Sequence, residues 1–173
     1  GLLMANELQA IDKVLRSGER PVTAILGGSK VSTKITIIEN ILPAVDNLII
    51  GGGMSFTFIK ALGGNIGNSL LEADKMDLAL EILEKAKQHN VKVFLPVDVV
   101  VADDFSNDAD RQEVDIYHIP EGWQGMDAGS KTREIFHDVI MNSRTILWNG
   151  PIGVFEMENF SAGTKALGDS IYE

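Results

Sequence analysis

The sequence predicts an α/β domain of the doubly wound kind, with a mainly parallel sheet and helices on both of its faces. Short apolar runs of strand length alternate along the chain with longer segments of helical periodicity. Three of the apolar runs end in glycine-rich turns, and 45% hydrophobic with 23% charged residues is the composition of a globular protein. Alternating strands and helices imply β-α-β units and therefore a parallel sheet.

The first part of the chain contains five predicted elements. Apolar residues spaced three and four apart predict an amphipathic helix over 3–17, and a run rich in Val, Thr and Ile predicts a buried strand over 21–26. Helical spacing returns over 35–42, directly ahead of a proline. A second apolar run predicts a strand over 47–50, and three glycines then lead into an apolar helix over 54–62.

The middle of the chain is less regular. Helical periodicity predicts a long helix over 76–89, and a third strand follows over 91–95. Pro96 interrupts this strand, and we expect 97–102 to resume it. Residues 103–122 are polar and rich in aspartate, so we expect a long loop there.

The last part predicts a helix over 130–140 that Ser130 caps, a strand over 145–148 and a final helix after Ser161. Because no linker, repeat or low-complexity segment divides the chain, we expect one three-layer, Rossmann-like domain over 1–173. The chain starts without Met and its last helix has no stop signal, so we expect it to be part of a longer protein.

The composition argues against several functions. With 15 Lys and Arg against 25 Asp and Glu, the net charge is −10, which disfavours a general nucleic-acid or anionic-membrane partner. The chain has no Cys, which excludes thiolate catalysis and cysteine-ligated metals. No stretch reaches the roughly 18 apolar residues of a membrane span.

Glycine-rich turns point to the edge of the sheet where a ligand binds. In an open parallel sheet the carboxyl ends of the strands share one edge, and ligands bind along it. Glycine there lets the backbone approach a ligand and leaves N–H groups free for phosphates. Glycine often ends a strand in α/β proteins without any ligand, but three such turns favour a binding site. They lie within Leu26–Lys30, Ile50–Met54 and Trp148–Gly153.

The first turn carries the clearest signal for an anion site. No acid occurs from Arg20 to Ile38 in a chain with 25 acids, whereas Lys30 and Lys34 lie in this window. On a helix these two lysines would share a face near its N-terminus, where neighbouring positive charges are unfavourable. A phosphate between them would make the electrostatic energy favourable and would accept hydrogen bonds from the N–H groups of the turn. We therefore predict a phosphate site; two solvated surface lysines are the alternative.

Other chemistries find less support. The Walker motif is absent, because Gly-Lys occurs nowhere, and the dinucleotide motif fails from Gly51, because its sixth position is Phe56. This argues against Walker-type NTPases and typical nicotinamide enzymes. His89, His118 and His137 lack metal-ligand spacing, and the aspartates after residue 102 do not match a calcium loop, so we predict no metal site.

The third turn adds a carboxylate. The segment Trp148–Glu156 places an amide, two glycines, a proline and Glu156 at the end of one strand. A glutamate at this edge can accept from both hydroxyls of a ribose, as an acid does in dinucleotide-binding folds. Considered alone, Glu156 is better explained as a surface residue.

Together these motifs resemble those of phosphoglycerate kinase. The segments that carry the resemblance occur in the order of the family and cover essentially the whole chain: Leu26–Ile35, Ile49–Met54, Ile66–Leu70, Leu95–Asp98, Gly122–Asp127 and Trp148–Glu156. Proteins of that family have two domains that face each other across a cleft. This chain resembles most of the C-terminal, nucleotide-binding domain, with residues 1–17 as the helix between the domains.

The resemblance implies a role for individual residues. Lys30 would face the transferred phosphoryl group as the catalytic residue, Lys34 would contact nucleotide phosphates, and Glu156 would accept the ribose hydroxyls. The other residues implied to bind the nucleotide are Gly27, Gly28, Ser29, Gly52, Gly53, Leu70, Gly125, Met126, Asn149, Pro151 and Val154.

The resemblance also implies a glycolytic, cytoplasmic, monomeric kinase. It would transfer a phosphoryl group reversibly between 1,3-bisphosphoglycerate and ADP, giving 3-phosphoglycerate and ATP, with Mg²⁺ carried by the nucleotide. The phosphoglycerate would bind to a domain outside this chain, so we expect the chain alone to be inactive. The family's later Gly-Gly-Gly-Asp turn does not occur here, and we expect the protein ligand of the metal outside this chain. A binding-only adenine-nucleotide module and an oxidoreductase remain alternatives.

Overall fold

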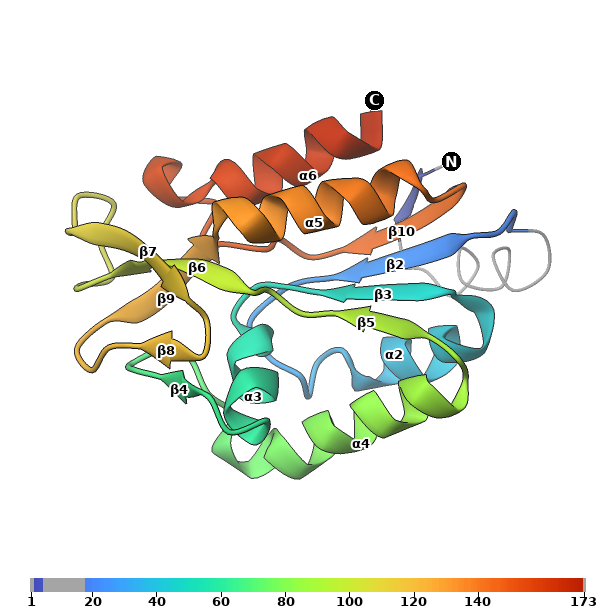
Figure 1. Cartoon of the computed structure of the whole chain (residues 1–173), viewed down its shortest axis with the longest axis horizontal. Coiled ribbons are helices and arrows are strands. Elements are labelled where there is room, and N and C mark those ends of the chain that lie inside the picture. Colours follow the sequence, from blue (N-terminus) through green and yellow to red (C-terminus); the bar gives the residue numbers. More distant parts are fainter. Residues whose placement is uncertain (1, 5–17, 173) are drawn as a thin grey trace.

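The computed structural model describes residues 2–4 and 18–172, and Figure 1 shows a central sheet between two layers of helices. The sheet has the strand order β1-β10-β2-β3-β5, and every neighbouring pair is parallel. Its strands are β1 (Leu2–Met4), β2 (Val22–Leu26), β3 (Asn47–Ile50), β5 (Lys92–Phe94) and β10 (Thr145–Asn149). The predicted doubly wound, mainly parallel α/β fold is therefore confirmed.

Helices cover both faces of this sheet, as Figure 1 shows. One face carries α2 (Ile35–Ile41), α3 (Met54–Ala61) and α4 (Met76–Gln88), and the other carries α5 (Ser130–Met141) and α6 (Ala162–Tyr172). In the described part of the chain, three short 3-10 helices connect elements: η1 (Leu42–Ala44), η2 (Ala73–Lys75) and η3 (Glu158–Phe160). No helix within the described ranges is long and apolar enough to cross a membrane.

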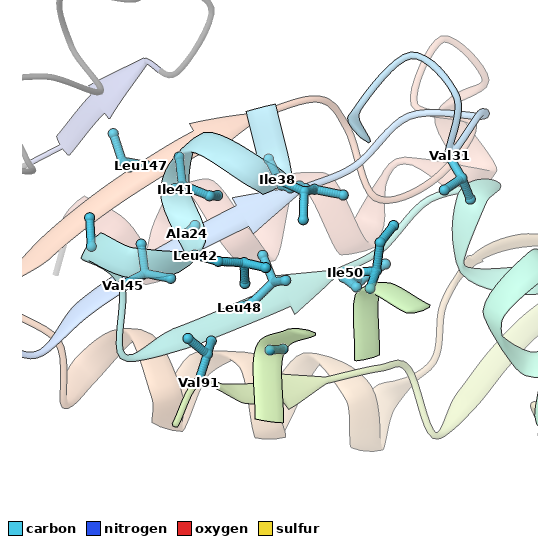
Figure 2. Packing of buried hydrophobic residues seen from close by; sticks show 14 of the residues in the cluster. Ala24, Val31, Ile38, Ile41, Leu42, Val45, Leu48, Ile50, Val91 and Leu147 are labelled. Atoms are coloured by element: carbon cyan, nitrogen blue, oxygen red, sulfur yellow. The ribbon is translucent and has the colours of Figure 1, made fainter. Parts of the chain in front are cut away.

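The strands are apolar on both faces because both faces are covered. Leu48 and Ile50 point to the side of α2, where they pack with Ile38 and Ile41 in the cluster of Figure 2. The residue between them, Ile49, belongs to the cluster on the opposite face with side chains of α5 and α6. Continuous apolar runs therefore predicted buried parallel strands correctly.

A second, antiparallel sheet lies at one end of the molecule, on the left of Figure 1. It has the order β7-β6-β9 and consists of β6 (Asp98–Ala102), β7 (Arg111–Asp115) and β9 (Gln124–Ala128). Beside it β4 (Asn65–Ile66) pairs with β8 (His118–Ile119). The prediction that 103–122 form only a loop is wrong for β7 and β8, and 97–102 do not resume the third strand of the main sheet. β7 is a polar, exposed edge strand, so its pairing with β6 leaves no apolar pattern in the sequence.

The N-terminal prediction is wrong for the residues that the structure describes there. Leu2–Met4 form a strand that pairs in parallel with β10, from Leu2 opposite Ile146 to Met4 opposite Trp148. A three-residue apolar run suits a short edge strand as well as it suits the start of a helix. The rest of the predicted helix, 5–17, and with it most of the proposed interdomain helix, lies outside the described residues.

Ser130 does not cap α5. Gly129 occupies the N-cap position, and the side chain of Ser130 donates to Glu113 of β7 instead. The N–H group of Ser130 also donates to Glu113, and the next two N–H groups donate to the carboxylate of Asp98 in β6, from Lys131 at 3.0 Å and from Thr132 at 2.9 Å. Acids from neighbouring strands thus replace the local cap that the sequence suggested.

Candidate functional site

The carboxyl ends of β2 and β10 meet where the sheet changes its winding direction. β2 lies between β3 and β10 in the sheet. The connection from β2 to β3 runs through α2 on one face, whereas the connection into β10 runs through α5 on the opposite face (Figure 1). Loops that leave two adjacent strands in opposite directions create a crevice, which is the usual ligand position in an open parallel sheet. The first and third glycine-rich turns therefore lie side by side at this crevice.

Backbone hydrogen bonds join the turns directly. Gly27 N–H donates to the Asn149 carbonyl at 2.8 Å, and Gly28 N–H donates to the Pro151 carbonyl at 3.0 Å. A Cβ on Gly27 would lie 2.0 Å from the Pro151 carbonyl oxygen, so only glycine permits this approach. Gly52, with a φ of +70°, packs on the same backbone, because a Cβ there would lie 2.7 Å from Gly28 N. The glycines hold three strand ends together.

This packing changes which N–H groups can meet an anion. Those of Gly27 and Gly28 are already occupied within the protein, contrary to the expectation that the first glycine pair stays free. In residues 2–4 and 18–172, the N–H groups of Ser29, Gly52 and Gly53 donate no hydrogen bond. They belong to the first and second turns, which adjoin, and are the candidates for binding a phosphate.

The two lysines of the first turn occupy different positions. α2 begins at Ile35 with Lys34 at its N-cap, and Lys30 precedes the helix, so the prediction that they share a helical face is wrong. The Lys34 side chain folds back over Gly28 and its Nζ donates to Asn149 Oδ1. Burial lowers the pKa of Lys34. Lys30 stays exposed in the loop after the turn.

An acid that is distant in sequence approaches this loop. The carboxylate of Glu72 accepts hydrogen bonds from Ser32 N–H at 3.2 Å and from Ser32 Oγ at 2.6 Å. Burial alone would raise the pKa of Glu72, but these hydrogen bonds and the charge of Lys30 outweigh burial and lower it. The segment from Arg20 to Ile38 contains no acid in sequence, but the fold brings the carboxylate of Glu72 against it.

A cavity of about 300 Å³ lies beside these turns. Ten of the residues predicted to bind a ligand line it: Gly28, Ser29, Gly52, Gly53, Leu70, Gly125, Met126, Pro151, Val154 and Glu156. The other four, Gly27, Lys30, Lys34 and Asn149, do not line it, although Gly27 and Asn149 are bonded to each other beneath the turns. The structure brings residues from distant segments around one cavity.

Several lining residues were not anticipated. Phe56 of α3 packs so closely on Gly125 that a Cβ there would lie 2.0 Å from the phenyl ring. Phe105, 57% exposed, comes from the acidic segment that was predicted to be a plain loop. Further lining comes from the antiparallel sheet, the turn after β7 and the turn after β10: Val99, Asp127, Ala128, Ile116, Ile152 and Gly153. An aromatic residue in an otherwise polar segment is the local signal that could have indicated Phe105.

Asp127 is a buried carboxylate at the wall of this cavity. Its two oxygens accept from Ala128 N–H at 2.9 Å and from Gly163 N–H at 3.0 Å, which joins β9 to the start of α6. Gly153 also packs against it, because a Cβ there would lie 2.2 Å from Asp127 Oδ1. Burial raises the pKa of Asp127 to about 6, although the backbone N–H groups and Arg133 oppose the rise.

This raised pKa predicts a pH-dependent contribution to stability. Folding strengthens proton binding by Asp127, so its contribution is complete at pH values below the unfolded pKa of about 3.9 and is lost as the pH rises through about 6. In urea unfolding between pH 4 and pH 8, we expect the wild-type chain to lose up to about 3 kcal/mol relative to Asp127→Asn. Parallel pH profiles of the two proteins would show that Asp127 stays ionised in the folded state.

Two of the three histidines, His118 and His137, contact other side chains of the chain. His118 Nδ1 lies 3.4 Å from an oxygen of Asp115, and His137 Nδ1 lies 2.8 Å from Ser170 Oγ. Across the described part of the chain, no three His, Asp or Glu side chains are placed to hold a metal ion together.

Comparisons with known proteins agree with the geometry. The sequence model of the family "Phosphoglycerate kinase" matches residues 1–173. A curated phosphoglycerate kinase of Porphyromonas gingivalis is 56% identical over the whole chain, which spans 41% of the length of that relative.

Solved structures show the same likeness. The phosphoglycerate kinase of Coxiella burnetii has a TM-score of 0.90 and 44% identity, and that of Pyrococcus horikoshii OT3 has a TM-score of 0.78 and 29% identity. Each comparison covers 95% of this chain and 42% of the other protein. The resemblance noted in the sequence is thus supported by the sequence and by the three-dimensional arrangement.

Proposed function

This chain belongs to the phosphoglycerate kinase family, and on that premise we propose that it supplies the nucleotide site of a two-domain kinase. The proposed reaction is reversible phosphoryl transfer between 1,3-bisphosphoglycerate and ADP, which gives 3-phosphoglycerate and ATP. The observation that carries the proposal is the cavity at the change of winding. It combines an apolar lining with unpaired backbone N–H groups, and Lys34 lies against one of its glycines.

The proposed pose follows from this distribution. The adenine would lie among the apolar side chains of the cavity, next to Leu70, which is 58% exposed and packs on Gly53. The ribose hydroxyls would donate to Glu156, which lies at the exposed side of the lining. The phosphates would reach the N–H groups of Ser29 and Gly52, with Lys34 behind them.

The chemistry that we propose needs position and charge from the protein. In-line phosphoryl transfer requires positive charge where the equatorial oxygens become more negative. Lys30 is exposed in the loop that follows Ser29. We therefore assign to Lys30 the stabilisation of the phosphoryl group during its transfer. The buried carboxylates of the cavity, Asp98 and Asp127, are occupied by backbone N–H groups, which leaves neither free as a nucleophile.

The proposal assigns the remaining parts of the reaction to other components. Mg²⁺ would arrive with the nucleotide, as the resemblance to the family implies. The phosphoglycerate would bind to the domain that the longer relatives have in addition, and closing two domains on the reactants aligns them and excludes water. By itself, this chain would bind ADP without turnover. We also propose that the protein is cytoplasmic and monomeric.

A charge-neutralising substitution tests the ribose assignment. We expect Glu156→Gln to weaken ADP binding by about 1.5–3 kcal/mol, because it removes the charge from the acceptor of the ribose hydroxyls. Binding of inorganic tripolyphosphate, which has no ribose, should stay unchanged. Isothermal titration calorimetry of both ligands measures the difference.

The matched control is Glu158→Gln, two residues further on, at an exposed glutamate that does not line the cavity. It should leave both affinities at the wild-type value. If Glu156→Gln weakens both ligands equally, or leaves ADP binding intact, Glu156 does not bind the ribose. A wild-type chain that prefers NADH to ADP would contradict the nucleotide-kinase proposal itself.

A further inference from the structure

Two segments that are far apart in sequence are tied together beside the cavity. One is the turn 103–110 between β6 and β7, and the other is η3. Asn159 N–H donates to Asn107 Oδ1 at 2.8 Å, and Asn159 Nδ2 donates to the Asn107 carbonyl at 2.6 Å. The side chain of each asparagine is thus hydrogen-bonded to the backbone of the other.

Both segments contribute to the lining of the cavity. Phe105 lines it from the β6–β7 turn, two residues before Asn107, and Glu156 lines it from the segment that leads into η3. Beneath the pair, Ala109 and Met157 pack against the same small cluster, formed by Ala102, Met126 and Phe160. A bond between the two segments therefore limits how far their lining residues can move apart.

The chemistry of the pair fits its surroundings. The turn carries Asp103, Asp104, Asp108 and Asp110, and η3 begins with Glu158. A carboxylate at either position of the pair would add like charge to this surface and would be repelled. Two amides make the same cross-connection without charge, so salt should have little effect on them.

We propose that Asn107 and Asn159 form a positioning pair that holds the Phe105 and Glu156 segments together and thereby sets the preference of the site for a nucleotide over a bare polyphosphate. The inference rests on the proposed function, because it takes the cavity to bind the nucleoside. In the proposed pose the phosphates meet the turns after β2 and β3, whereas the hydrogen bonds of the pair join the β6–β7 turn to η3. Loss of the pair should therefore affect the nucleoside end alone.

The test measures binding of ADP and of inorganic tripolyphosphate by calorimetry. We expect Asn107→Ala and Asn159→Ala each to raise the Kd for ADP by about 3- to 10-fold and to leave the Kd for tripolyphosphate unchanged. Asn40→Ala, at an exposed asparagine of α2 outside the cavity lining, is the matched control and should change neither. Thermal unfolding of each variant shows that it is folded during the titration.

A conservative variant separates positioning from a general structural role. Asn107→Asp keeps an oxygen that accepts from Asn159 N–H but adds a negative charge. At 0.5 M KCl, where the charge is screened over a few ångströms, its ratio of ADP to tripolyphosphate affinity should return to the wild-type ratio in the same buffer. Asn107→Ala should not recover.

The outcomes distinguish the two proposals. If the wild-type chain binds ADP no more tightly than tripolyphosphate, the proposed function and this inference are both overturned. If the wild type prefers ADP but Asn107→Ala and Asn159→Ala keep that preference, or lose both ligands equally, only the positioning pair is overturned. Loss of ADP preference in both variants with recovery in Asn107→Asp at high salt supports it.

Discussion

Lys30→Ala is expected to lower kcat by about 10²–10³, or roughly 2.7–4 kcal/mol, in the longer protein that contains both domains. A donor aimed at charge that develops in the transition state affects the rate far more than the binding of the nucleotide. We assign this role to Lys30 because it is exposed and precedes α2, whereas we expect Lys34 to contact the ground-state phosphates. Steady-state kinetics with both substrates saturating measures the effect.

Lys34→Ala is the matched comparison for this prediction. The Lys34 ammonium is partly buried, packs on Gly28 and is hydrogen-bonded to Asn149, so we expect it to contribute alike before and during transfer. An interaction of equal strength in both states changes KM and leaves kcat alone. Direct ADP titration alongside kinetics separates the two lysines. If Lys30→Ala keeps the wild-type kcat, Lys30 does not stabilise the transferred group.

Gly27→Ala is expected to cost about 4 kcal/mol of folding stability and to abolish ADP binding with it. The added Cβ would lie 2.0 Å from the Pro151 carbonyl oxygen and 2.7 Å from that of Gly150. Both atoms belong to the backbone and cannot move away by rotation of a side chain. The overlap would push β2 and β10 apart at the point where the crevice opens.

Gly168→Ala is the control for this substitution. Gly168 lies in α6, and apart from the backbone of its own helix and its chain neighbours a Cβ there would meet no atom within 4 Å. In a helix interior alanine is more favourable than glycine by up to about 1 kcal/mol, so this variant should be slightly more stable than the wild type. Urea unfolding curves give both differences. Equal midpoints for the two variants would show that the turns are not packed backbone to backbone.

The main sheet was predictable because its signals are local. The runs that became β2, β3 and β10 are apolar on consecutive residues, which a strand covered on both faces requires. α4 and α5 were equally visible, since each keeps a buried side at helical spacing. α3 was visible as an apolar segment after the glycines, and it is buried on all sides over 54–59. Polar β7 and the two-residue β8 carry no such pattern, and their pairing with other strands is what defines them.

The candidate site was predictable in part for the same reason. The glycines of three turns and the carboxylate of Glu156 could be read from short motifs and from the resemblance to a family. Phe56 and Phe105 were missed, because both come from segments whose own patterns indicate a core helix and a solvated loop. The bond of Lys34 to Asn149 joins residues 115 positions apart, a relation that no local pattern contains.

The sequence by itself determined the types of the main elements, the places where the backbone needs glycine and the motifs that resemble one family. These depend on side-chain polarity and on backbone freedom, which are properties of a residue and its neighbours. Only the tertiary structure decided that β2 and β10 are adjacent, that Glu72 approaches Lys30 and that β9 brings Gly125 to Phe56. Strand pairing uses backbone hydrogen bonds that are the same for every residue except proline, so the order of strands emerges from the packing of the whole chain.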